Sequence, residues 1–317
     1  MEKLASIAYR TPLTTSSTID RFTGKQVYFK MENMQKTGAF KIRGASYKLA
    51  LLSGQETEKG IIAASAGNHA QGVALAASKR GIPVKIFMPE NTPLAKIAAT
   101  RNYGAAVVLS GNNYDEAYEA ALTEQKTTKS TFVHPFDDYD VMAGQSTIAV
   151  EMLEQQPLID TLIVPVGGGG LIGGIAVAAK LVKPNIRVIG VQAKGACSMF
   201  NHFYQTSVGK QTEVNTIAEG IAVRKPGTLT SSIIHQYVDE MLTVSDHEIA
   251  AAMVYMLERK KMLLEGAGAA AFAALLTHGR NILSQHCGVI VSGGNLDISK
   301  IAQIQHLARQ NFLSYLA

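Results

Sequence analysis

Short apolar runs alternate with longer segments of helical period between residues 61 and 134. A run of four or five residues rich in Val, Ile and Ala predicts a strand buried on both faces, and the segment between two such runs predicts a crossover helix. The pattern therefore predicts a small parallel sheet wrapped by helices. We expect its strands at 61–65, 84–88, 106–109 and 131–134, and its helices at 68–80, 93–103 and 114–125.

The same alternation resumes after residue 134 and predicts a second, larger lobe that also takes in the N-terminal segment. A chain of 317 residues is long enough for two cores. We therefore predict an α/β protein with a large domain of residues 1–52 and 138–317 and a small domain of residues 53–137. In the larger lobe we expect strands at 162–166, 187–192 and 289–292, and helices at 144–155, 171–182, 246–261, 267–276 and from 298.

Composition and charge exclude several classes of protein. A hydrophobic fraction of 47% is typical of a folded domain, and the net charge of +5 is spread along the chain, so we expect no nucleic-acid partner. Cys197 and Cys287 lack the CxxC spacing, and no two histidines have the spacing of a zinc site, so we expect no metal.

The first residues lack the apolar core of a signal peptide, and no apolar run reaches the roughly 18 residues of a membrane helix. We expect no membrane partner and a cytoplasmic location.

Four consecutive glycines, Gly167–Gly170, follow the strand expected at 162–166 and precede a helix. Glycines let the backbone approach an anion closely, and the amides at the start of a helix attract it. A tight turn alone would explain one or two glycines, so the run favours a phosphate site. The spacing also satisfies the GxGxxG pattern of dinucleotide-binding folds, but Gln192 stands where such a fold needs an acidic residue. Dinucleotide binding is therefore disfavoured.

Three further motifs lie where a ligand could bind. Lys41 follows the sequence TGAF, and a lysine amine can form an imine with an aldehyde cofactor, although a lone lysine is normally a solvated charge. SAGNHAQG spans 65–72 at the junction of a strand and a helix, where Asn68 suits a helix cap and the amides suit an anion. His69 is better explained as a residue that packs or bonds locally than as a base. Ser292, in SGGN, could bond a ring nitrogen or simply form a turn.

Taken in chain order, the motifs TGAFKIRGA, SAGNHAQG, HPFDD, VPVGGGGLIGG, TIAEGIAV, EGAGAAAFAAL and SGGN resemble those of the fold-type II enzymes that use pyridoxal 5′-phosphate (PLP). The resemblance spans nearly the whole chain and is closest to the threonine dehydratase and serine racemase branch. It implies a tryptophan synthase β-like fold, in which two parallel-sheet lobes have the active site in the cleft between them. It also implies PLP as the cofactor and an amino acid as the small-molecule substrate.

The resemblance implies a role for each residue of the site. Lys41 would carry the cofactor as an imine and act as the catalytic base, with Phe40 against one face of the ring and Gly220 near the other. Asn68 would bond the phenolic oxygen, Ser292 would bond the pyridine nitrogen, and the glycine run would hold the phosphate. The residues that bind the cofactor would be Phe40, Lys41, Asn68, Gly167, Gly168, Gly169, Gly170, Leu171, Gly220 and Ser292. The substrate carboxylate would be received by the amides of Ser65, Ala66, Asn68 and His69.

A serine at the pyridine nitrogen keeps that nitrogen less protonated than a carboxylate would, so the ring is a weaker electron sink. Such a ring favours rapid loss of a β-leaving group over a long-lived carbanion. The expected reaction is therefore the conversion of L-threonine to 2-oxobutanoate and ammonia, together with that of L-serine to pyruvate. Threonine and serine differ by one methyl group, worth only about 1–3 kcal/mol in a pocket, so the preference between them stays open.

Two differences from the family pattern favour a dehydratase over a racemase. Racemases of this branch have a serine proton donor where this chain has Ala66, and members with a divalent ion have acidic residues where this chain has Gln192 and Ser198. Serine racemase and a β-replacing, cysteine synthase-like enzyme remain the alternatives. A catalytically silent amino-acid-binding protein is opposed only by the combined presence of Lys41, Asn68 and Ser292.

Three other differences have no explanation from the sequence: Ala39 replaces the usual serine, Ser146 the usual glycine and Glu219 the usual aspartate. Glu219 adjoins Gly220, so it could alter how substrate fits. Because the chain ends at Ala317, we expect no appended regulatory domain and hence a degradative role. We also expect a homo-oligomer, a dimer or a tetramer, which is the common state of such enzymes. No motif indicates whether a nucleotide or a monovalent cation regulates it.

Overall fold

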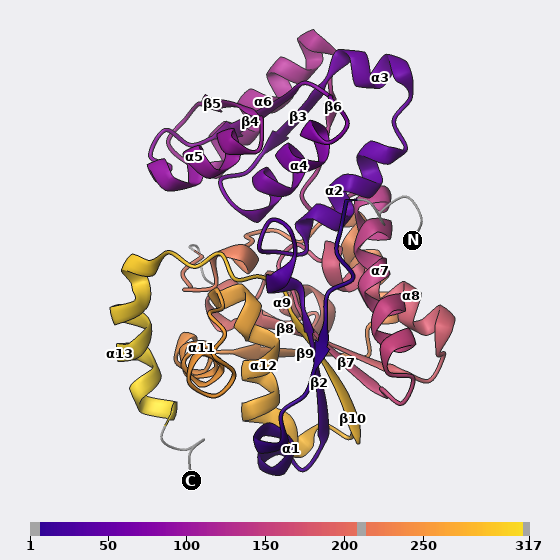
Figure 1. Ribbon diagram of the computed structural model, residues 1–317, viewed down its shortest axis with the longest axis vertical. Helices are drawn as coiled ribbons and strands as arrows, with labels where there is room; N and C mark the ends of the chain where they lie inside the picture. The colour runs from indigo at the N-terminus through magenta and orange to yellow at the C-terminus, as the bar shows by residue number, and fades with distance from the viewer. Residues whose placement is uncertain (1–6, 208–213, 313–317) are drawn as a thin grey trace. The chain divides into compact units, whose positions relative to one another are not determined.

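The computed structural model describes residues 7–207 and 214–312, and the chain forms two compact units (Figure 1). Of the described residues, the smaller unit comprises 7–10 and Gln35–Gln145. The larger unit comprises Thr11–Met34, 146–207 and 214–312. This division places residues 7–10, 35–52 and 138–145 with the smaller unit, whereas the predicted boundaries assign them to the large domain. The boundaries 1–52, 53–137 and 138–317 stay a prediction about the domains.

The smaller unit is built on a parallel sheet with the strand order β5-β4-β3-β6. Every strand predicted between residues 61 and 134 is present, although the last of them ends two residues early. The last strand is short because its backbone pairs with β3 over only two residues. The strands are β3 (Ile61–Ala64), β4 (Val84–Met88), β5 (Ala106–Leu109) and β6 (Thr131–Phe132).

Helices cover both faces of this sheet. On one face Ala121 of α6 packs against Ile62, Ala64 and Phe87, and on the other face α2 and α4 bury an apolar cluster that includes Ile42. The predicted helices are confirmed, but α2 and α3 were not predicted, because each is short and polar along much of its length. The helices are α2 (Lys41–Ala50), α3 (Gly54–Lys59), α4 (Asn68–Ser78), α5 (Leu94–Asn102), α6 (Tyr114–Thr128) and the start of α7 (Tyr139–Gln155).

The larger unit is built on a mixed sheet with the strand order β1-β2-β10-β7-β8-β9. Only β1 is antiparallel to its neighbour. The N-terminal segment supplies β1 and β2 to this sheet, and neither strand was predicted. The unpredicted β9 alternates buried and half-buried residues, and its run EMLTV carries no clear strand pattern. The strands are β1 (Leu13–Thr14), β2 (Gln26–Met31), β7 (Thr161–Pro165), β8 (Arg187–Ala193), β9 (Glu240–Val244) and β10 (His286–Val291).

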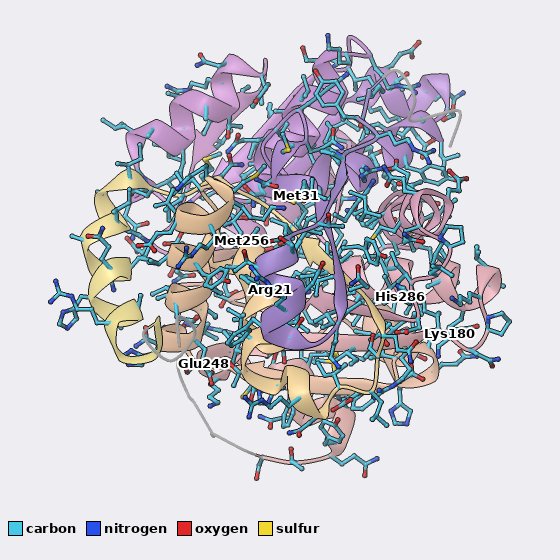
Figure 2. The ribbon with its side chains drawn as sticks, turned by 60° about the horizontal axis from the view of Figure 1, so that its bottom comes forward. Arg21, Met31, Lys180, Glu248, Met256 and His286 are labelled. Atoms are coloured by element: carbon cyan, nitrogen blue, oxygen red, sulfur yellow. The ribbon has the colours of Figure 1, made fainter. Side chains whose placement is uncertain are left out.

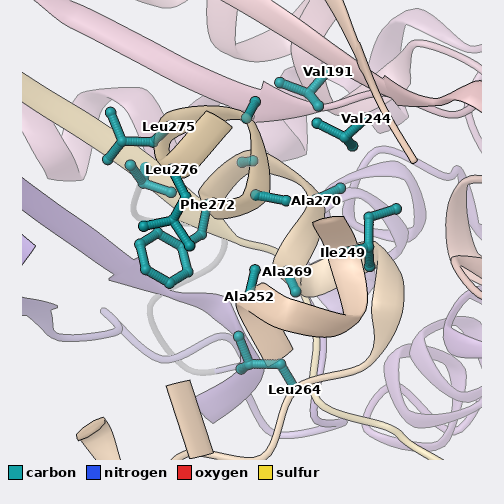
Figure 3. Close-up of a cluster of buried hydrophobic side chains, with 14 of the residues drawn as sticks. Val191, Val244, Ile249, Ala252, Leu264, Ala269, Ala270, Phe272, Leu275 and Leu276 are labelled. Atoms are coloured by element: carbon teal, nitrogen blue, oxygen red, sulfur yellow. The ribbon is translucent and has the colours of Figure 1, made fainter. Parts of the chain in front are cut away.

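The core of the larger unit lies between this sheet and α12, whose sequence GAGAAAFAALLTH is almost entirely buried (Figure 3). Small alanines let the helix approach the strands closely. The ring of Phe272 packs edge-on against that of Phe29, with 5.3 Å between the ring centroids. Met31 and Met256, labelled in Figure 2, belong to the same core. The helices of this unit are α1 (Ser17–Thr23), the rest of α7, α8 (Gly170–Val182), α9 (Ser198–Tyr204), α10 (Thr228–Tyr237), α11 (Asp246–Lys260), α12 (Gly266–His278) and α13 (Ile301–Phe312).

Short 3₁₀ turns connect several of these elements. They are η2 (Glu32–Met34), η3 (Lys194–Ala196), η4 (Glu219–Ile221), η5 (Gly279–Asn281) and η6 (Ile298–Lys300). Among the described residues, no helix is both long and apolar enough to cross a membrane.

The helix that begins at Lys41 is fixed by a close crossing with α7. A Cβ atom on Gly144 would lie 2.5 Å from the carbonyl oxygen of Arg43 and 2.5 Å from the Cα atom of Gly44. A Cβ atom on Gly44 would lie 2.7 Å from the carbonyl oxygen of Val141. The two backbones therefore touch, and only glycine permits this contact. The crossing sets where α2 begins and hence where Lys41 lies.

We expect Gly144→Ala to destabilise the protein by about 1–3 kcal/mol, because backbone atoms must shift to admit the new methyl group. Gly54→Ala is the matched control, since a Cβ atom there would meet nothing within 4 Å. The control should leave stability unchanged or raise it by up to about 1 kcal/mol. Urea unfolding of the two variants beside the wild type measures both effects. Equal stability of the two variants would contradict a tight crossing.

Candidate active site

The residues predicted to form the site fall into two groups, one on each unit. In both groups they lie at the ends of strands or in the first turns of helices. The smaller unit carries Phe40, Lys41, Ser65, Ala66, Asn68 and His69. The larger unit carries Gly167, Gly168, Gly169, Gly170, Leu171, Gly220 and Ser292.

Lys41 is the first residue of α2 and follows Phe40 at the cap position. Its Nζ atom donates a hydrogen bond to the carbonyl oxygen of Pro135 at 2.6 Å. The same atom lies 5.2 Å from the centroid of the Phe40 ring, within the range of a cation–π contact. The amine is therefore oriented by a neutral carbonyl and an aromatic ring.

The helix α4 brings the SAGNHAQG turn against the start of α2. A Cβ atom on Gly72 would lie 3.0 Å from the carbonyl carbon of Lys41 and 3.1 Å from the amide nitrogen of Ile42. Glycine at this position lets the two helices approach closely. The first turn of α4, which contains Asn68 and His69, is thereby held near the lysine.

The turn itself corrects two of the sequence interpretations. The Ser65 amide already donates to the carbonyl of Phe87 at 3.1 Å, so this amide is used within the sheet. Its hydroxyl oxygen accepts from the Gly67 amide at 3.2 Å, and its hydroxyl proton is the group that could reach a ligand. The helix begins at Asn68 with Gly67 as its cap, so Asn68 does not act as the capping side chain. The amides of Ala66, Asn68 and His69 remain the predicted carboxylate donors.

His69 is buried and bonds locally. Its Nε2 atom lies 2.8 Å from the carbonyl oxygen of Val133, and because a carbonyl only accepts, Nε2 carries the proton. Its Nδ1 atom is buried without a hydrogen-bond partner among the described residues. Burial, together with the positive charge of Lys41, lowers the pKa of His69 to about 3. The side chain is therefore neutral at ordinary pH and is a poor base, as the sequence suggested.

In the larger unit the glycine run forms a turn between β7 and α8. Gly169 has φ +97°, and a Cβ atom on it would lie 2.7 Å from Cβ of Thr230. Gly168 accepts a hydrogen bond from the Thr230 hydroxyl at 2.7 Å, and Gly167 accepts one from Gln192 at 3.5 Å. No side chain caps α8. Because these carbonyls are already bonded, the polar groups that the turn can offer a ligand are its N–H groups.

Ser292 and Gly220 both lie against Ala267 of α12. The Ser292 hydroxyl, only 3% exposed, donates to the carbonyl of Ala267 at 3.2 Å. A Cβ atom on Gly220 would lie 2.9 Å from Cβ of Ala267. A Cβ atom on Gly167 would in turn lie 3.0 Å from Cα of Ile221, which adjoins Gly220. The unit therefore brings together the glycine turn, Gly220 and Ser292.

Of the three unexplained sequence differences, the structure places two. Ala39 is fully buried, so a serine there would need a hydrogen-bond partner. Glu219 forms an ion pair with Lys300, and both side chains are exposed. Nothing in the structure explains Ser146.

The residues present fit PLP. The turn at Gly169 has no room for a Cβ atom and offers uncapped helix amides, which suits a phosphate group. A lysine amine suits the aldehyde, and a buried hydroxyl suits a ring nitrogen. Each unit supplies part of this set of groups.

The chain matches the family model of pyridoxal-phosphate dependent enzymes over residues 4–293. It belongs to this family. The match confirms the resemblance, the α/β fold-type II class and the cofactor that the motifs indicated. The chain is thus a PLP-dependent enzyme, and the fit of its two groups of residues agrees with this assignment.

Relatives and solved structures agree with the family. The chain is 49% identical to the L-threonine ammonia-lyase of Thermotoga maritima, over 95% of this chain and 75% of that protein. It is 42% identical to the catabolic L-threonine dehydratase TdcB of Escherichia coli K12, over 96% of this chain and 93% of that protein. Its fold is similar to that of threonine deaminase isoform 2 from Solanum lycopersicum, with a TM-score of 0.92, 36% identity and coverage of 97% and 85% of the two chains. Maize serine racemase has a TM-score of 0.90 at 37% identity, with coverage of 98% and 96%.

Sequence inspection missed several residues that support these groups. The Thr230 hydroxyl donates to the Gly168 carbonyl in the glycine turn, but a threonine within a helix has no distinctive sequence pattern. Pro135 and His134 belong to the HPFDD motif, which had been quoted only as part of the resemblance. Gln192 donates to the Gly167 carbonyl in the glycine turn. The sequence indicates only that it departs from a dinucleotide-binding pattern, and its position at a strand end is the feature that could have predicted a role in the site.

The buried neutral His69 predicts a loss of stability in acid. Its pKa in the folded protein, about 3, lies below the ordinary value of 6.5, so the unfolded chain binds a proton between these values and the folded chain does not. Stability from this group is present above pH 6.5 and falls as the pH drops toward 3. Between pH 6 and pH 5 the loss should be roughly 1 kcal/mol.

His69→Gln isolates this effect, because the glutamine amide can still donate to Val133 but does not titrate. Urea unfolding of wild type and variant at a series of pH values measures the difference. The difference in free energy of unfolding between wild type and variant should become steadily smaller below pH 6.5. A difference that does not change with pH would show that His69 is not buried in its neutral form.

Proposed function

We propose that this chain is a PLP-dependent ammonia-lyase that converts L-threonine to 2-oxobutanoate and ammonia, and L-serine to pyruvate and ammonia. The observation that carries the proposal is the Lys41 amine, held by Pro135 at the start of α2 in a member of the PLP family. The threonine ammonia-lyases and dehydratases named above are 42–49% identical to this chain. Serine racemases among the similar structures support the activity on serine.

We assign the cofactor to the residues of both units acting together. The amides of Gly167–Gly170 and Leu171 would hold its phosphate, the Asn68 side chain its phenolic oxygen and Ser292 its ring nitrogen. Phe40 and Gly220 would lie against its two faces. Bound PLP supplies a conjugated ring that draws electrons from the substrate and so makes its Cα proton acidic.

The chain's own groups then bind substrate and move a proton. The amides of Ala66, Asn68 and His69, with the Ser65 hydroxyl, would hold the substrate carboxylate in the first turn of α4, where the helix dipole favours an anion. Lys41 would remove the Cα proton as general base. The β-hydroxyl would then leave as water, taking up a proton that the cofactor phosphate could relay to it. Because His69 is neutral and a poor base, the group assigned to take the Cα proton is Lys41.

Two features favour elimination over racemisation. Ala66 has no proton to offer to the opposite face of the substrate, and the Ser65 hydroxyl oxygen is turned toward the Gly67 amide. Ser292 is a neutral hydroxyl, so unlike a carboxylate it cannot act as an ionised partner that keeps the ring nitrogen protonated. Serine racemase is the second candidate, because two similar structures, from maize and Dictyostelium discoideum, carry that name.

We propose a degradative role, since the relatives from Staphylococcus aureus and Escherichia coli are named catabolic dehydratases. A cytoplasmic location and a homo-oligomer, a dimer or a tetramer, complete the proposal. Symmetric homo-oligomers are the common state of soluble enzymes.

The test is release of 2-oxo acid from L-threonine and L-serine by the PLP-loaded enzyme. Lys41→Ala should abolish turnover and the visible imine band while leaving the thermal unfolding transition in place, because the imine and the general base are lost together. Lys59→Ala is the matched control, since Lys59 is an exposed lysine in the last turn of α3. Substantial turnover by the Lys41 variant would refute the assignment. Formation of D-serine faster than pyruvate would favour the racemase.

Added Mg²⁺ should leave the rate of either reaction unchanged. At the positions where the family resemblance would place the ligands of a divalent ion, both side chains are uncharged and bonded within the protein. Gln192 accepts from the Phe200 amide at 2.7 Å, and Ser198 donates to the Val223 carbonyl at 3.0 Å. Within the described residues, no group of three or more His, Cys, Asp or Glu side chains could hold a metal. Assays with Mg²⁺ and with a chelator check this, and a large stimulation by Mg²⁺ would overturn it.

A further inference from the structure

The carbonyl that holds Lys41 belongs to a tight turn organised by a histidine. The Nδ1 atom of His134 lies 3.2 Å from the amide nitrogen of Phe136 and 2.7 Å from that of Asp137. Both amides can only donate, so Nδ1 is the acceptor and His134 is neutral with its proton on Nε2. The side chain therefore closes a turn over residues 134–137, in the way an Asn or Asp side chain closes an Asx turn.

The residues around this turn limit its freedom. Pro135 has a fixed φ and no N–H group, and it restricts His134 to extended backbone. The His134 ring packs edge-on against Phe136 at 4.7 Å and Tyr118 at 6.2 Å between ring centroids. The Pro135 carbonyl is thus presented in one direction, and at its end lies the Lys41 amine, 2.6 Å away.

We propose that His134 is a positioning residue for Lys41: its Nδ1 atom fixes the turn so that the Pro135 carbonyl holds the Lys41 ammonium whenever this amine is not bonded to the cofactor. The role in the reaction rests on the proposed function. When Lys41 takes the Cα proton, the C–H bond breaks, an N–H bond forms at Nζ, and the electron pair stays with the substrate. The new ammonium then has an acceptor already in place.

Two histidines and two aspartates are the other titratable groups close to this turn. His69 and His134 are both neutral, because burial lowers their pKa values and the charge of Lys41 lowers them further. Asp138 is paired with Lys48 at 2.9 Å. Asp137 raises the pKa of His134 without outweighing burial. The hydrogen bond from Nζ to the Pro135 carbonyl stabilises the charged form of Lys41 directly.

His134→Leu and His134→Asn form a matched pair. Leucine and asparagine have similar size, and both lack the ring that packs on Phe136 and Tyr118. Only asparagine has an acceptor near the place of Nδ1, and Asn-Pro is itself a favoured start of a turn. A difference between the two variants therefore reports the acceptor and not the loss of ring packing.

The first readout is acetylation of Lys41 in the full chain prepared without PLP, followed by mass spectrometry across a pH series with Lys59 as internal reference. In His134→Leu the midpoint of the Lys41 profile should move to lower pH by about one unit, equivalent to about 1.4 kcal/mol, because the ammonium loses its aligned acceptor. The plateau at high pH should not change. In His134→Asn the midpoint should stay close to that of the wild type.

The second readout uses the PLP-loaded enzyme and glycine, which has no β-leaving group and displaces Lys41 from the cofactor. The glycine concentration for half-conversion, followed by the visible spectrum, should rise about ten-fold in His134→Leu, the equivalent of one pH unit. His134→Asn should again resemble the wild type. Thermal unfolding of all three proteins establishes that the variants are folded.

Three results would overturn the proposal: an unchanged midpoint in His134→Leu, equal shifts in the leucine and asparagine variants, or a raised plateau with no shift of the midpoint. The last would show that the turn only shields Lys41 from reagent. The acetylation profile needs neither PLP nor turnover, so it stands or falls separately from the Lys41→Ala assay.

Discussion

In both units the carboxyl ends of parallel strands meet at one edge of a sheet, and many of the groups suited to a cofactor depend on this constraint. β3 and β6 are neighbours, so the turn at Ser65 and the turn at His134 lie next to each other. The Val133 carbonyl, just before the His134 turn, bonds His69, and the Pro135 carbonyl within the turn bonds Lys41. β7 and β10 are neighbours as well, which brings the glycine turn close to Ser292. Most of the contacts are made by backbone groups, because strand ends and helix starts leave amides and carbonyls unpaired by the regular ladder.

Small residues allow these edges to come close enough for such contacts. Gly144 lets α7 touch α2, Gly72 lets α4 touch the start of α2, and Gly268 brings α12 against the backbone of Gly293 beside Ser292. In each case a methyl group would displace main-chain atoms, and main-chain atoms are the ones that orient the functional groups. The precision of the site therefore depends on packing distances several residues away from the chemistry.

The sequence predicted strands β3 to β8 and β10, because each contains an apolar run, although β5 is partly exposed. It did not predict three strands (β1, β2 and β9) or five helices (α1, α2, α3, α9 and α10), because short or mixed polar and apolar segments leave the structure to tertiary packing. The glycine turn was predicted because four consecutive glycines are unusual. Lys41 was predicted because its motif occurs together with several others in the order of the family. Thr230, Pro135 and His134 were not, since a hydroxyl in a helix or a carbonyl after a strand has no distinctive sequence. The Ser65 amide was misassigned because strand pairing with β4, which uses that amide, cannot be read from a motif.

The electrostatics around Lys41 are consistent with its use as a base. A lysine beside an ionised carboxylate is held strongly in its charged form, and a lysine buried without any acceptor loses its charge entirely. The Pro135 carbonyl lies between these extremes: it stabilises the ammonium as a dipole but leaves the amine able to lose its proton. The two neighbouring histidines add no charge, because their burial keeps them neutral. An amine that must alternate between a covalent bond, a free base and an ammonium is best served by such a neutral partner, since no one state is then favoured so strongly that the others become inaccessible.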